Sequence, residues 1–158
     1  MKVGDSMKTT VVTIAQSAKV RDAVLLFVNN HISMLPVLDK EGRPVGAVHL
    51  RDLLERVMPV FVDLIKDFDY VGDFGAIEDG MPEASWLEGA VTTVMEPIET
   101  VETSSGLVRA FSIMKKRDIL DLPVVDREGR LAGLASRVDI GRALLTNWHV
   151  DVDEDRGA

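Results

Sequence analysis

Two aspartates, Asp52 and Asp139, stand at the same place in two similar stretches of the sequence. Each ends a pattern of glycine, two apolar residues, a polar residue, two further residues and aspartate, first at 46–52 and again at 133–139. At the start of a helix, such a carboxylate can accept hydrogen bonds from both hydroxyls of a ribose, while free first-turn N–H groups bind a phosphate. It could instead only cap the helix and complement its dipole. The residues by themselves leave both interpretations open.

Arrangements typical of catalysis or metal binding are missing from the sequence. The histidines, His31, His49 and His149, have no i,i+4 or HExxH spacing and the chain has no cysteine, so we expect no metal site. The acidic residues are scattered and give no paired general acid and base. We therefore expect no catalytic residue and no enzyme, with a metal-dependent hydrolase as an open alternative. His49 could form a pH-sensitive contact, because it occupies the polar position of the first pattern.

The two aspartates belong to a longer repeat, in which the same order of residues returns after 87 positions. The segment 32–39 is similar to 119–126, the Glu-Gly-Arg of 41–43 returns at 128–130, and Gly46 corresponds to Gly133. A repeat of this length predicts two copies of one supersecondary unit, which stack through a shared apolar face.

Each copy is predicted to fold as a strand, a helix, two strands and a second helix. In the first copy, apolar residues at helical spacing predict a helix from Lys19 to Asn30, with Ser17 as its N-cap. Pro36 is expected at the start of its strand, and Gly42 can take a positive φ in the hairpin turn at 39–43. The other predicted elements are strands 11–13, 35–38 and 45–49 and a helix opened by Asp52 in the first copy, and strands 99–101, 122–126 and 131–136, turn 127–130 and helices 105–117 and 138–147 in the second.

The repeat divides the chain into four parts. We expect a first repeat at 1–57, an inter-repeat insertion at 58–90, a second repeat at 91–148 and a disordered acidic tail at 149–158. Pro59 should break or kink the helix before it. The aromatic residues of the insertion argue against simple disorder. We predict a loop and short helix packed over one edge, with a binding element as the alternative.

The composition disfavours several kinds of partner and location. The 158 residues carry a net charge of −8, which disfavours broad contact with nucleic acid or anionic membrane, because both attract basic surfaces. No signal peptide is visible at the N-terminus, and no apolar run is long enough to span a bilayer. A chain without cysteine forms no disulfide, and we expect a cytoplasmic protein.

The two copies together resemble a pair of CBS domains, the family named after cystathionine β-synthase. The resemblance is carried by the blocks ISMLPVLDKEGRPVG (32–46) and ILDLPVVDREGRLAG (119–133), each followed by the pattern that ends in aspartate. It covers about residues 3–56 and 91–145. The family implies an α+β fold of two β-α-β-β-α repeats packed sheet to sheet about a pseudo-two-fold, here with a long inter-repeat insertion. It also implies binding of an adenosyl ligand without catalysis.

The resemblance further implies two ligand clefts, each with residues from both repeats. In the cleft that fits the family better, Asp139 would bind the ribose, and Ile32 and Met34 would flank the adenine. Ser136, Ser33 and Lys8 could reach phosphate. The complete set for this cleft is Lys8, Thr10, Val12, Ile32, Ser33, Met34, Ser136, Val138 and Asp139.

The other cleft implied by the resemblance departs from the family pattern. Its residues would be His49, Arg51, Asp52, Ile98, Glu99, Ile119, Leu120 and Asp121. His49 replaces the usual threonine or serine. Glu99 and Asp121 add negative charge that Arg51 only partly offsets, so an anionic phosphate faces repulsion there.

With no output domain in the sequence, the resemblance predicts a regulatory module that binds AMP, ADP or ATP and signals occupancy to an unknown protein partner. The nucleotide is a ligand, and no cofactor is required. Pairs of this family commonly dimerise through their helices, so we expect a homodimer whose surface could use Val24, Leu53, Leu54, Phe111, Leu144 and Leu145. The alternatives are S-adenosylmethionine as the ligand and a ligand-independent dimerisation or interaction module.

Overall fold

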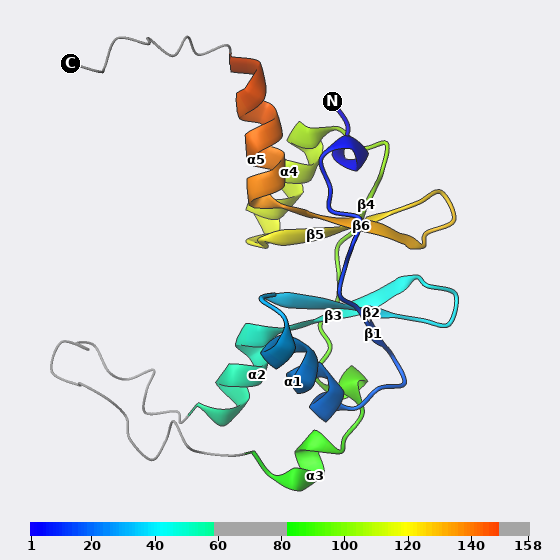
Figure 1. Cartoon of the computed structure of the whole chain (residues 1–158), viewed down its shortest axis with the longest axis vertical. Coiled ribbons are helices and arrows are strands. Elements are labelled where there is room, and N and C mark those ends of the chain that lie inside the picture. Colours follow the sequence, from blue (N-terminus) through cyan, green and yellow to red (C-terminus); the bar gives the residue numbers. More distant parts are fainter. Residues whose placement is uncertain (59–81, 149–158) are drawn as a thin grey trace, which may run out of the picture. The chain divides into compact units, whose positions relative to one another are not determined.

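The computed structural model describes residues 1–58 and 82–148, which belong to two compact units (Figure 1). The first unit takes Val12–Ile98, and the second unit combines Met1–Val11 with the residues from Glu99 onward. The predictions for Pro59, for most of the insertion, for His149 and for the tail at 149–158 lie outside the described residues.

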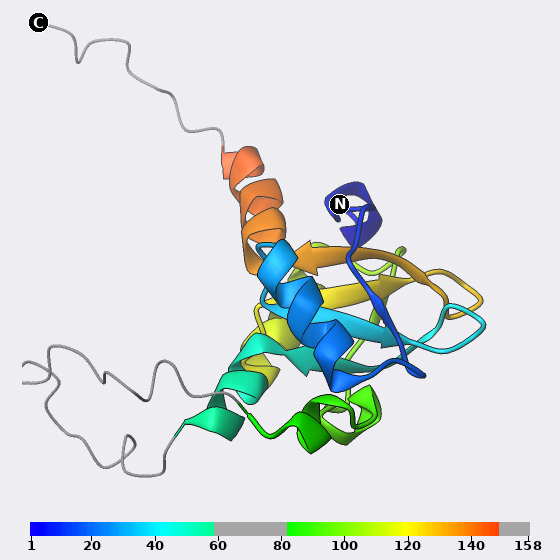
Figure 2. The ribbon, with the colours of Figure 1, turned by 60° about the horizontal axis from the view of Figure 1, so that its bottom comes forward.

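The first unit contains a three-stranded sheet in the order β1-β2-β3. Strand β1 runs parallel to β2, and β2 runs antiparallel to β3 with Val37 opposite Gly46. Strand β3 ends at His49 and α2 begins at the next residue, so no loop separates them (Figure 2). The elements are β1 (Ile14–Ala15), α1 (Val20–Asn29), β2 (Met34–Leu38), β3 (Pro44–His49), α2 (Leu50–Val57), α3 (Ala84–Leu87) and the 3-10 turn η4 (Val91–Thr93).

The second unit repeats this topology with the strand order β4-β5-β6. Strand β4 is parallel to β5, and β5 is antiparallel to β6 with Val124 opposite Gly133. The elements are η1 (Val3–Asp5), β4 (Val101–Glu102), α4 (Leu107–Arg117), β5 (Asp121–Val125), β6 (Leu131–Ser136), α5 (Arg137–Leu145) and η5 (Thr146–Trp148). The predicted α+β class and the duplication of one β-α-β-β-α unit are therefore confirmed.

The two hairpin turns form as predicted and have the same local geometry. Gly42 and Gly129 both have φ of 79°, a value that favours glycine because it has no Cβ. Asp39 Oδ1 accepts hydrogen bonds from the N–H groups of residues 41 and 43, at 2.9 and 2.8 Å. Asp126 Oδ1 does the same for residues 128 and 130, at 2.9 Å each. These turns depend on contacts within five residues, which is why the sequence predicts them well.

Proline occupies the central strand of each sheet at a point where no ladder hydrogen bond is lost. Pro36 lies opposite Ala47 of β3, but Ala47 exchanges both of its backbone hydrogen bonds with Glu96, at 3.0 and 2.8 Å. The nitrogen of Pro36 therefore faces the β1 side, where β1 begins only at Ile14, opposite Val37. Pro36 is the third residue of β2, so its predicted place at the start of the strand was wrong.

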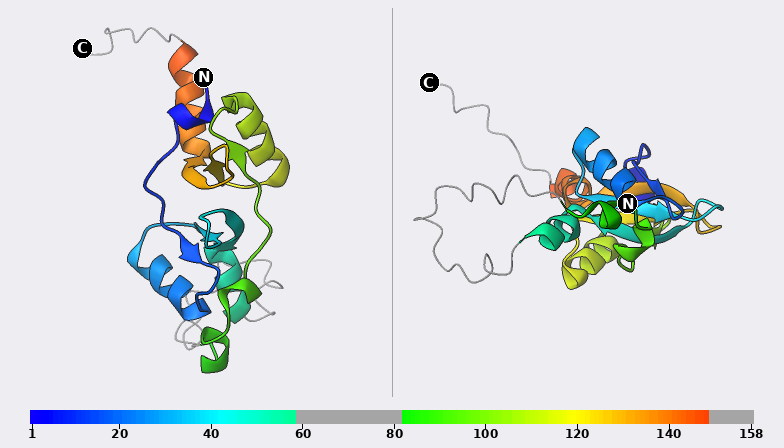
Figure 3. Two further views of the ribbon diagram at one scale, coloured as in Figure 1. Left: turned by 90° about the vertical axis from the view of Figure 1, so that its right-hand side faces the viewer. Right: turned by 90° about the horizontal axis from the view of Figure 1, so that it is seen from below.

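Each unit is completed by a segment that precedes the other copy in the sequence. Residues 1–8, the N-terminal arm, belong to the second unit, where the Val3 N–H donates to the Ser105 carbonyl at 2.9 Å and Lys8 pairs with Leu134 of β6. Figure 3 shows η1, in dark blue, next to the helices of the second unit. Residues 90–96, the second arm, belong to the first unit, where the Val91 N–H donates to the Ala18 carbonyl at 2.9 Å.

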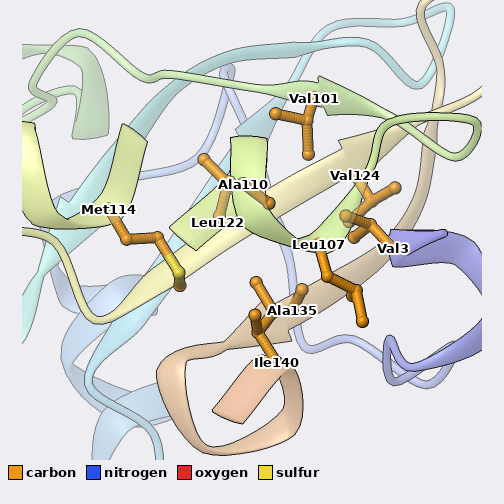
Figure 4. Close-up of a cluster of buried hydrophobic side chains, with 9 residues drawn as sticks. All are labelled: Val3, Val101, Leu107, Ala110, Met114, Leu122, Val124, Ala135 and Ile140. Atoms are coloured by element: carbon orange, nitrogen blue, oxygen red, sulfur yellow. The ribbon is translucent and has the colours of Figure 1, made fainter. Parts of the chain in front are cut away.

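A buried valine anchors each arm in the core of its unit. Val3 and Val91 have no exposed surface. Figure 4 shows Val3 beside Leu107 and Val124 in the second core. The second core consists of Val3, Val101, Leu107, Ala110, Met114, Leu122, Val124, Ala135 and Ile140. The first core consists of Ile14, Val20, Ala23, Phe27, Leu35, Val37, Val48, Leu53 and Val91.

Two glycines allow the arms to approach the sheets. A Cβ on Gly133 would lie 2.6 Å from the Lys8 carbonyl oxygen and 2.6 Å from the Met7 sulfur. A Cβ on Gly46 would meet Met95 and Glu96 in the same way. Real Cβ atoms do not approach that closely, so glycine is required at both positions for the arm to pair with the third strand of its sheet.

Some predicted boundaries were wrong because tertiary contacts set them. The leading strands lie at 14–15 and 101–102, not at 11–13 and 99–101. The N-cap of α1 is Lys19, not Ser17. The Val20 N–H donates to the carbonyl of Gly89, the residue directly before the second arm, at 3.0 Å. Asp22 accepts from the Lys19 N–H at 2.9 Å and so closes the first turn of the helix. The remaining helices and strands begin and end within about two residues of their predicted limits.

Candidate functional site

Asp139 lies in the first turn of α5, where a capping box fixes its carboxylate. The Ser136 hydroxyl donates to Asp139 Oδ2 at 2.7 Å and the Ser136 N–H donates to the same oxygen at 3.0 Å. In return, the Ser136 hydroxyl accepts from the Asp139 N–H at 3.1 Å. All three bonds depend on the spacing Ser-x-x-Asp. None of them uses Asp139 Oδ1, so this oxygen can accept hydrogen bonds from a ligand hydroxyl.

The charge of Asp139 is stabilised by its surroundings. Burial raises the pKa of Asp139, but the hydroxyl and N–H of Ser136 and the positive charges of Lys8 and Arg142 outweigh this effect and lower the pKa below its ordinary value. Lys8 Nζ lies 3.9 Å from Asp139 Oδ2, and its side chain is 67% exposed. The arm therefore brings an ammonium group beside an ionised carboxylate, where it can also meet a phosphate.

Asp52 occupies the same position in α2 but has different contacts. The N-cap residue is His49, and among the described residues its side chain makes no capping hydrogen bond. Asp52 Oδ1 pairs with Arg51 Nε at 3.2 Å, and Arg51 Nε lies 3.8 Å from Glu55. Asp52 Oδ2 is buried and has no hydrogen-bond partner in the described part of the chain. A buried acceptor without a donor costs about 1–3 kcal/mol, so the Asp52 turn is less well stabilised than the Asp139 turn.

Each unit brings its aspartate turn next to the start of its own central strand. In the first unit, Met34 lies opposite His49, and the Leu50 N–H donates to the Ser33 carbonyl at 3.0 Å. In the second unit, Asp121 lies opposite Ser136. Residues of both predicted clefts thus meet within each unit. The predicted clefts themselves join residues of the two units, and that grouping stays a prediction.

The other predicted ligand residues differ in their exposure. Met34 is buried, with 4% of its surface exposed, and Val12 and Ile32 pack against the first core. Val138 and Leu120 are 66% and 59% exposed. Ile119 packs against the second core, Ile98 and Glu99 are half-buried, and Thr10 is exposed.

The negative charge predicted for the second cleft is partly compensated within the second unit. Glu99 Oε1 forms an ion pair with Arg117 Nη2 at 2.8 Å. Both side chains are about half exposed, so solvent screens the pair and its contribution is small. The repulsion that the sequence predicts for a phosphate near Glu99 is nevertheless reduced by a cation held beside it.

One residue of this region was missed by the sequence analysis. Arg137 directly follows Ser136, and its guanidinium donates to the Ile119 carbonyl at 2.8 Å and to the Met114 carbonyl at 3.2 Å. A signal was present, because the repeat aligns this arginine with the apolar Leu50 of the first copy. The arms were missed for another reason. Their shared Val-x-x-x-Met spacing, at 3–7 and 91–95, has an offset of 88 instead of 87.

Within residues 1–58 and 82–148, no group of three or more histidine, cysteine, aspartate or glutamate side chains could hold a metal ion. Every helix in these same residues is too short or too polar to cross a bilayer.

Comparisons with known proteins show the family of the chain and its similarity to solved structures. A family model described as CBS domain matches residues 3–59 and again residues 91–146. The uncharacterized protein MJ1426 of Methanocaldococcus jannaschii is 28% identical over 92% of this chain and 92% of its own length. MJ1404 of the same organism is 31% identical over 88% of this chain, which spans 31% of that protein. The crystal structure of CBSX2 in complex with AMP is 28% identical, with a TM-score of 0.67 over 92% of this chain and 96% of that one, and CBSX2 comes from Arabidopsis thaliana.

Proposed function

The chain belongs to the CBS domain family as a tandem pair, and from this premise we propose that it is a regulatory module that binds an adenine nucleotide. The observation that carries the proposal is the carboxylate of Asp139, which is held ionised at the start of α5 with Oδ1 outside its internal bonds. The complex of CBSX2 with AMP, at 28% identity, supports the same class of ligand. Binding would favour one conformation over others and so pass the occupancy of the site to a partner protein.

In this proposal Asp139 accepts from the ribose hydroxyls through Oδ1, which its capping box does not use. Lys8, whose ammonium lies 3.9 Å from Asp139 Oδ2, reaches the phosphate. Ser136 and Ser33 are further phosphate contacts, and Ile32 and Met34 flank the adenine. The ligand is AMP, ADP or ATP, and the protein acts by binding and not by catalysis.

We further propose that the site of Asp139 binds nucleotide more tightly than the site of Asp52. Both aspartates have a cation beside them, Lys8 for Asp139 and Arg51 for Asp52. The Asp139 turn has in addition a serine N-cap that can meet phosphate, whereas the N-cap of the Asp52 turn is His49. The Glu99–Arg117 pair reduces the negative charge that the sequence predicts for the Asp52 site, so weaker binding there is expected and not its complete loss. Two unequal binding events are therefore expected.

Calorimetry with AMP, ADP, ATP and S-adenosylmethionine tests the proposal. Asp139→Ala removes the ribose acceptor, and a lost charged hydrogen bond is worth roughly 1.5–3 kcal/mol, so the affinity should fall about tenfold or more. Asp52→Ala is the matched control and should have the smaller effect. Circular dichroism on both variants excludes unfolding as the cause. If Asp52→Ala abolishes binding and Asp139→Ala does not, the two sites have been assigned in the wrong order.

A ligand-independent interaction module is the second candidate, and the exposed apolar residues of the helices favour it. Leu54, Phe111 and Leu145 are 50%, 39% and 51% exposed, as the predicted dimer surface requires. Leu53 is buried in the first core, and Val24 and Leu144 pack against the cores, so these three contribute less to an interface. Absence of binding by all four adenosyl compounds would favour this module over the nucleotide sensor.

We propose that the chain forms a homodimer through these helices in the cytoplasm, where a chain without cysteine loses no disulfide. Contiguous exposed apolar patches mark interaction surfaces, and in this proposal the exposed residues of these helices supply one. Sedimentation at micromolar concentration should give twice the mass of 17.4 kDa. A mass of one chain across that range would contradict the dimer, and Leu54→Glu should lower the association where a dimer is seen.

A further inference from the structure

Arg137 ties the start of α5 to the end of α4 within the second unit. Its backbone N–H donates to the Leu120 carbonyl at 2.9 Å. Its guanidinium donates to the carbonyls of Ile119 and Met114, at 2.8 and 3.2 Å, and to Asp118 Oδ1 at 3.1 Å. One residue therefore holds four acceptors, one in the last turn of α4 and three in the segment 118–120 that joins α4 to β5.

The two carbonyl bonds of the guanidinium matter more than the ion pair. The last carbonyls of a helix have no partner inside the helix and form the negative end of its dipole, so a guanidinium is favoured there. The side chain of Arg137 is 34% exposed, whereas Asp118 is 97% exposed, and a pair with so exposed a carboxylate is screened by solvent. The planar fork of arginine presents two nitrogens, Nε and Nη2, to the two carbonyls in one fixed geometry, whereas lysine would have to approach both carbonyls with a single nitrogen.

The segment that Arg137 holds and the residues beside Arg137 belong to different predicted sites. Ile119, Leu120 and Asp121 are contacts of the Asp52 site. Ser136, Val138 and Asp139 are contacts of the Asp139 site. Both sets are in the second unit. Arg137 donates hydrogen bonds to Ile119 and Leu120 of the first set, and in the sequence it stands between Ser136 and Val138 of the second set.

The first unit has no equivalent of this link in its described residues. The residue of the first unit that corresponds to Arg137 is Leu50. Its side chain has no hydrogen-bond donor, and its backbone N–H donates to the Ser33 carbonyl at 3.0 Å. The end of α1 is closed instead by Asn30, whose amide donates to the Leu26 carbonyl of its own helix at 2.8 Å. The two copies thus differ at the position that joins the aspartate turn to the preceding helix.

We propose that Arg137 is a positioning residue that makes the two nucleotide sites cooperative, an inference that rests on the proposed function. A ligand bound at Asp139 further restrains the aspartate turn, and through Arg137 it also restrains residues 119–121. The second ligand then meets a segment that is already ordered and loses less conformational entropy on binding. Binding at one site therefore strengthens binding at the other, by about fivefold or more.

The first experiment needs no ligand and tests the link itself. Amide NMR spectra are compared for Asp139→Asn in the wild-type chain and in Arg137→Leu, which copies Leu50. The substitution at residue 139 should shift the amides of 118–121 in the wild-type background and much less in Arg137→Leu. Arg137→Lys, which keeps the charge and loses the fork, should behave like Arg137→Leu. Equal shifts in all backgrounds would overturn the proposal.

The second experiment measures the coupling by calorimetry with AMP. The coupling factor is the ratio by which a first bound AMP strengthens the binding of the second. It should be about five or more in the wild type, and about two or less in Arg137→Leu and Arg137→Lys. Arg109→Leu, an exposed arginine of α4, is the control and should keep the wild-type factor. Unchanged coupling in both Arg137 variants refutes the role of Arg137. If AMP does not bind, the same titrations are made with ADP and ATP. Absence of binding by all three nucleotides refutes the proposed function, and the ligand-free spectra then decide the link separately.

Discussion

The exchange of arms between the two copies leads to a prediction about stability. Val3 lies at the start of the first repeat in the sequence, yet its side chain is fully buried in the core of the second unit. Val3→Ala removes two methyl groups from that core. At about 0.8 kcal/mol for each buried carbon, plus a term for the cavity, the loss should be about 2 kcal/mol. A substitution near the N-terminus should therefore destabilise the second unit, although the sheet and helices of that unit come from the C-terminal half of the chain.

Hydrogen exchange followed by NMR can assign the loss to one unit. A change of about 2 kcal/mol raises the population of the open form roughly thirtyfold, because each 1.4 kcal/mol corresponds to a factor of ten. In Val3→Ala, the slow amides of α4, β5, β6 and α5 should exchange faster by this factor. The slow amides of α1, β2 and β3 should keep their wild-type rates.

Val91→Ala is the matched control, since Val91 is equally buried and belongs to the first core. It should produce the mirror image, with faster exchange in α1, β2 and β3 and little change in the second unit. The reasoning is refuted if Val3→Ala speeds exchange in the first unit as strongly as in the second. It is also refuted if both substitutions act on the same unit, because the arms would then not be packed as described.

Three further predictions concern stability. Gly133→Ala should destabilise the second unit by about 1–3 kcal/mol in thermal unfolding, because the new Cβ meets the Lys8 carbonyl. Gly141→Ala is the control and should not destabilise the unit, because its new Cβ meets no described atom within 4 Å. His49→Ser should stabilise the first unit by about 1 kcal/mol, since it creates with Asp52 the capping box that Ser136 forms with Asp139, and an unchanged melting temperature would contradict this. Burial raises the pKa of Asp139, but Ser136, Lys8 and Arg142 lower it below its ordinary value. The ionised carboxylate therefore stabilises the fold at pH values above the pKa of the unfolded state. This contribution is lost as the pH falls through the pKa of the folded state. The melting temperature should thus fall between about pH 5 and pH 3 by less in Asp139→Asn than in the wild type.

The candidate site was predictable from the sequence to the extent that its contacts are local. The capping box of Ser136 and Asp139 spans three residues, and its spacing can be read directly from the chain. The link from Arg137 to Met114 spans 23 residues, and nothing in the local pattern around Arg137 indicates it. The two bonds on Asp139 Oδ2 confirm the capping interpretation of this carboxylate, and the binding of a ligand hydroxyl by Oδ1 stays a prediction.

The sequence by itself determined the elements whose geometry depends on near neighbours. The hairpin turns at Gly42 and Gly129, the helices and the central strands follow from backbone preferences and contacts a few residues apart. The tertiary structure alone decided which unit receives each arm, where β1 and β4 begin, and which of Leu53 and Leu54 is buried. These features depend on partners far away in the chain. The apolar pattern of an arm shows that it must be buried but not against which sheet, because the two copies offer nearly the same surface.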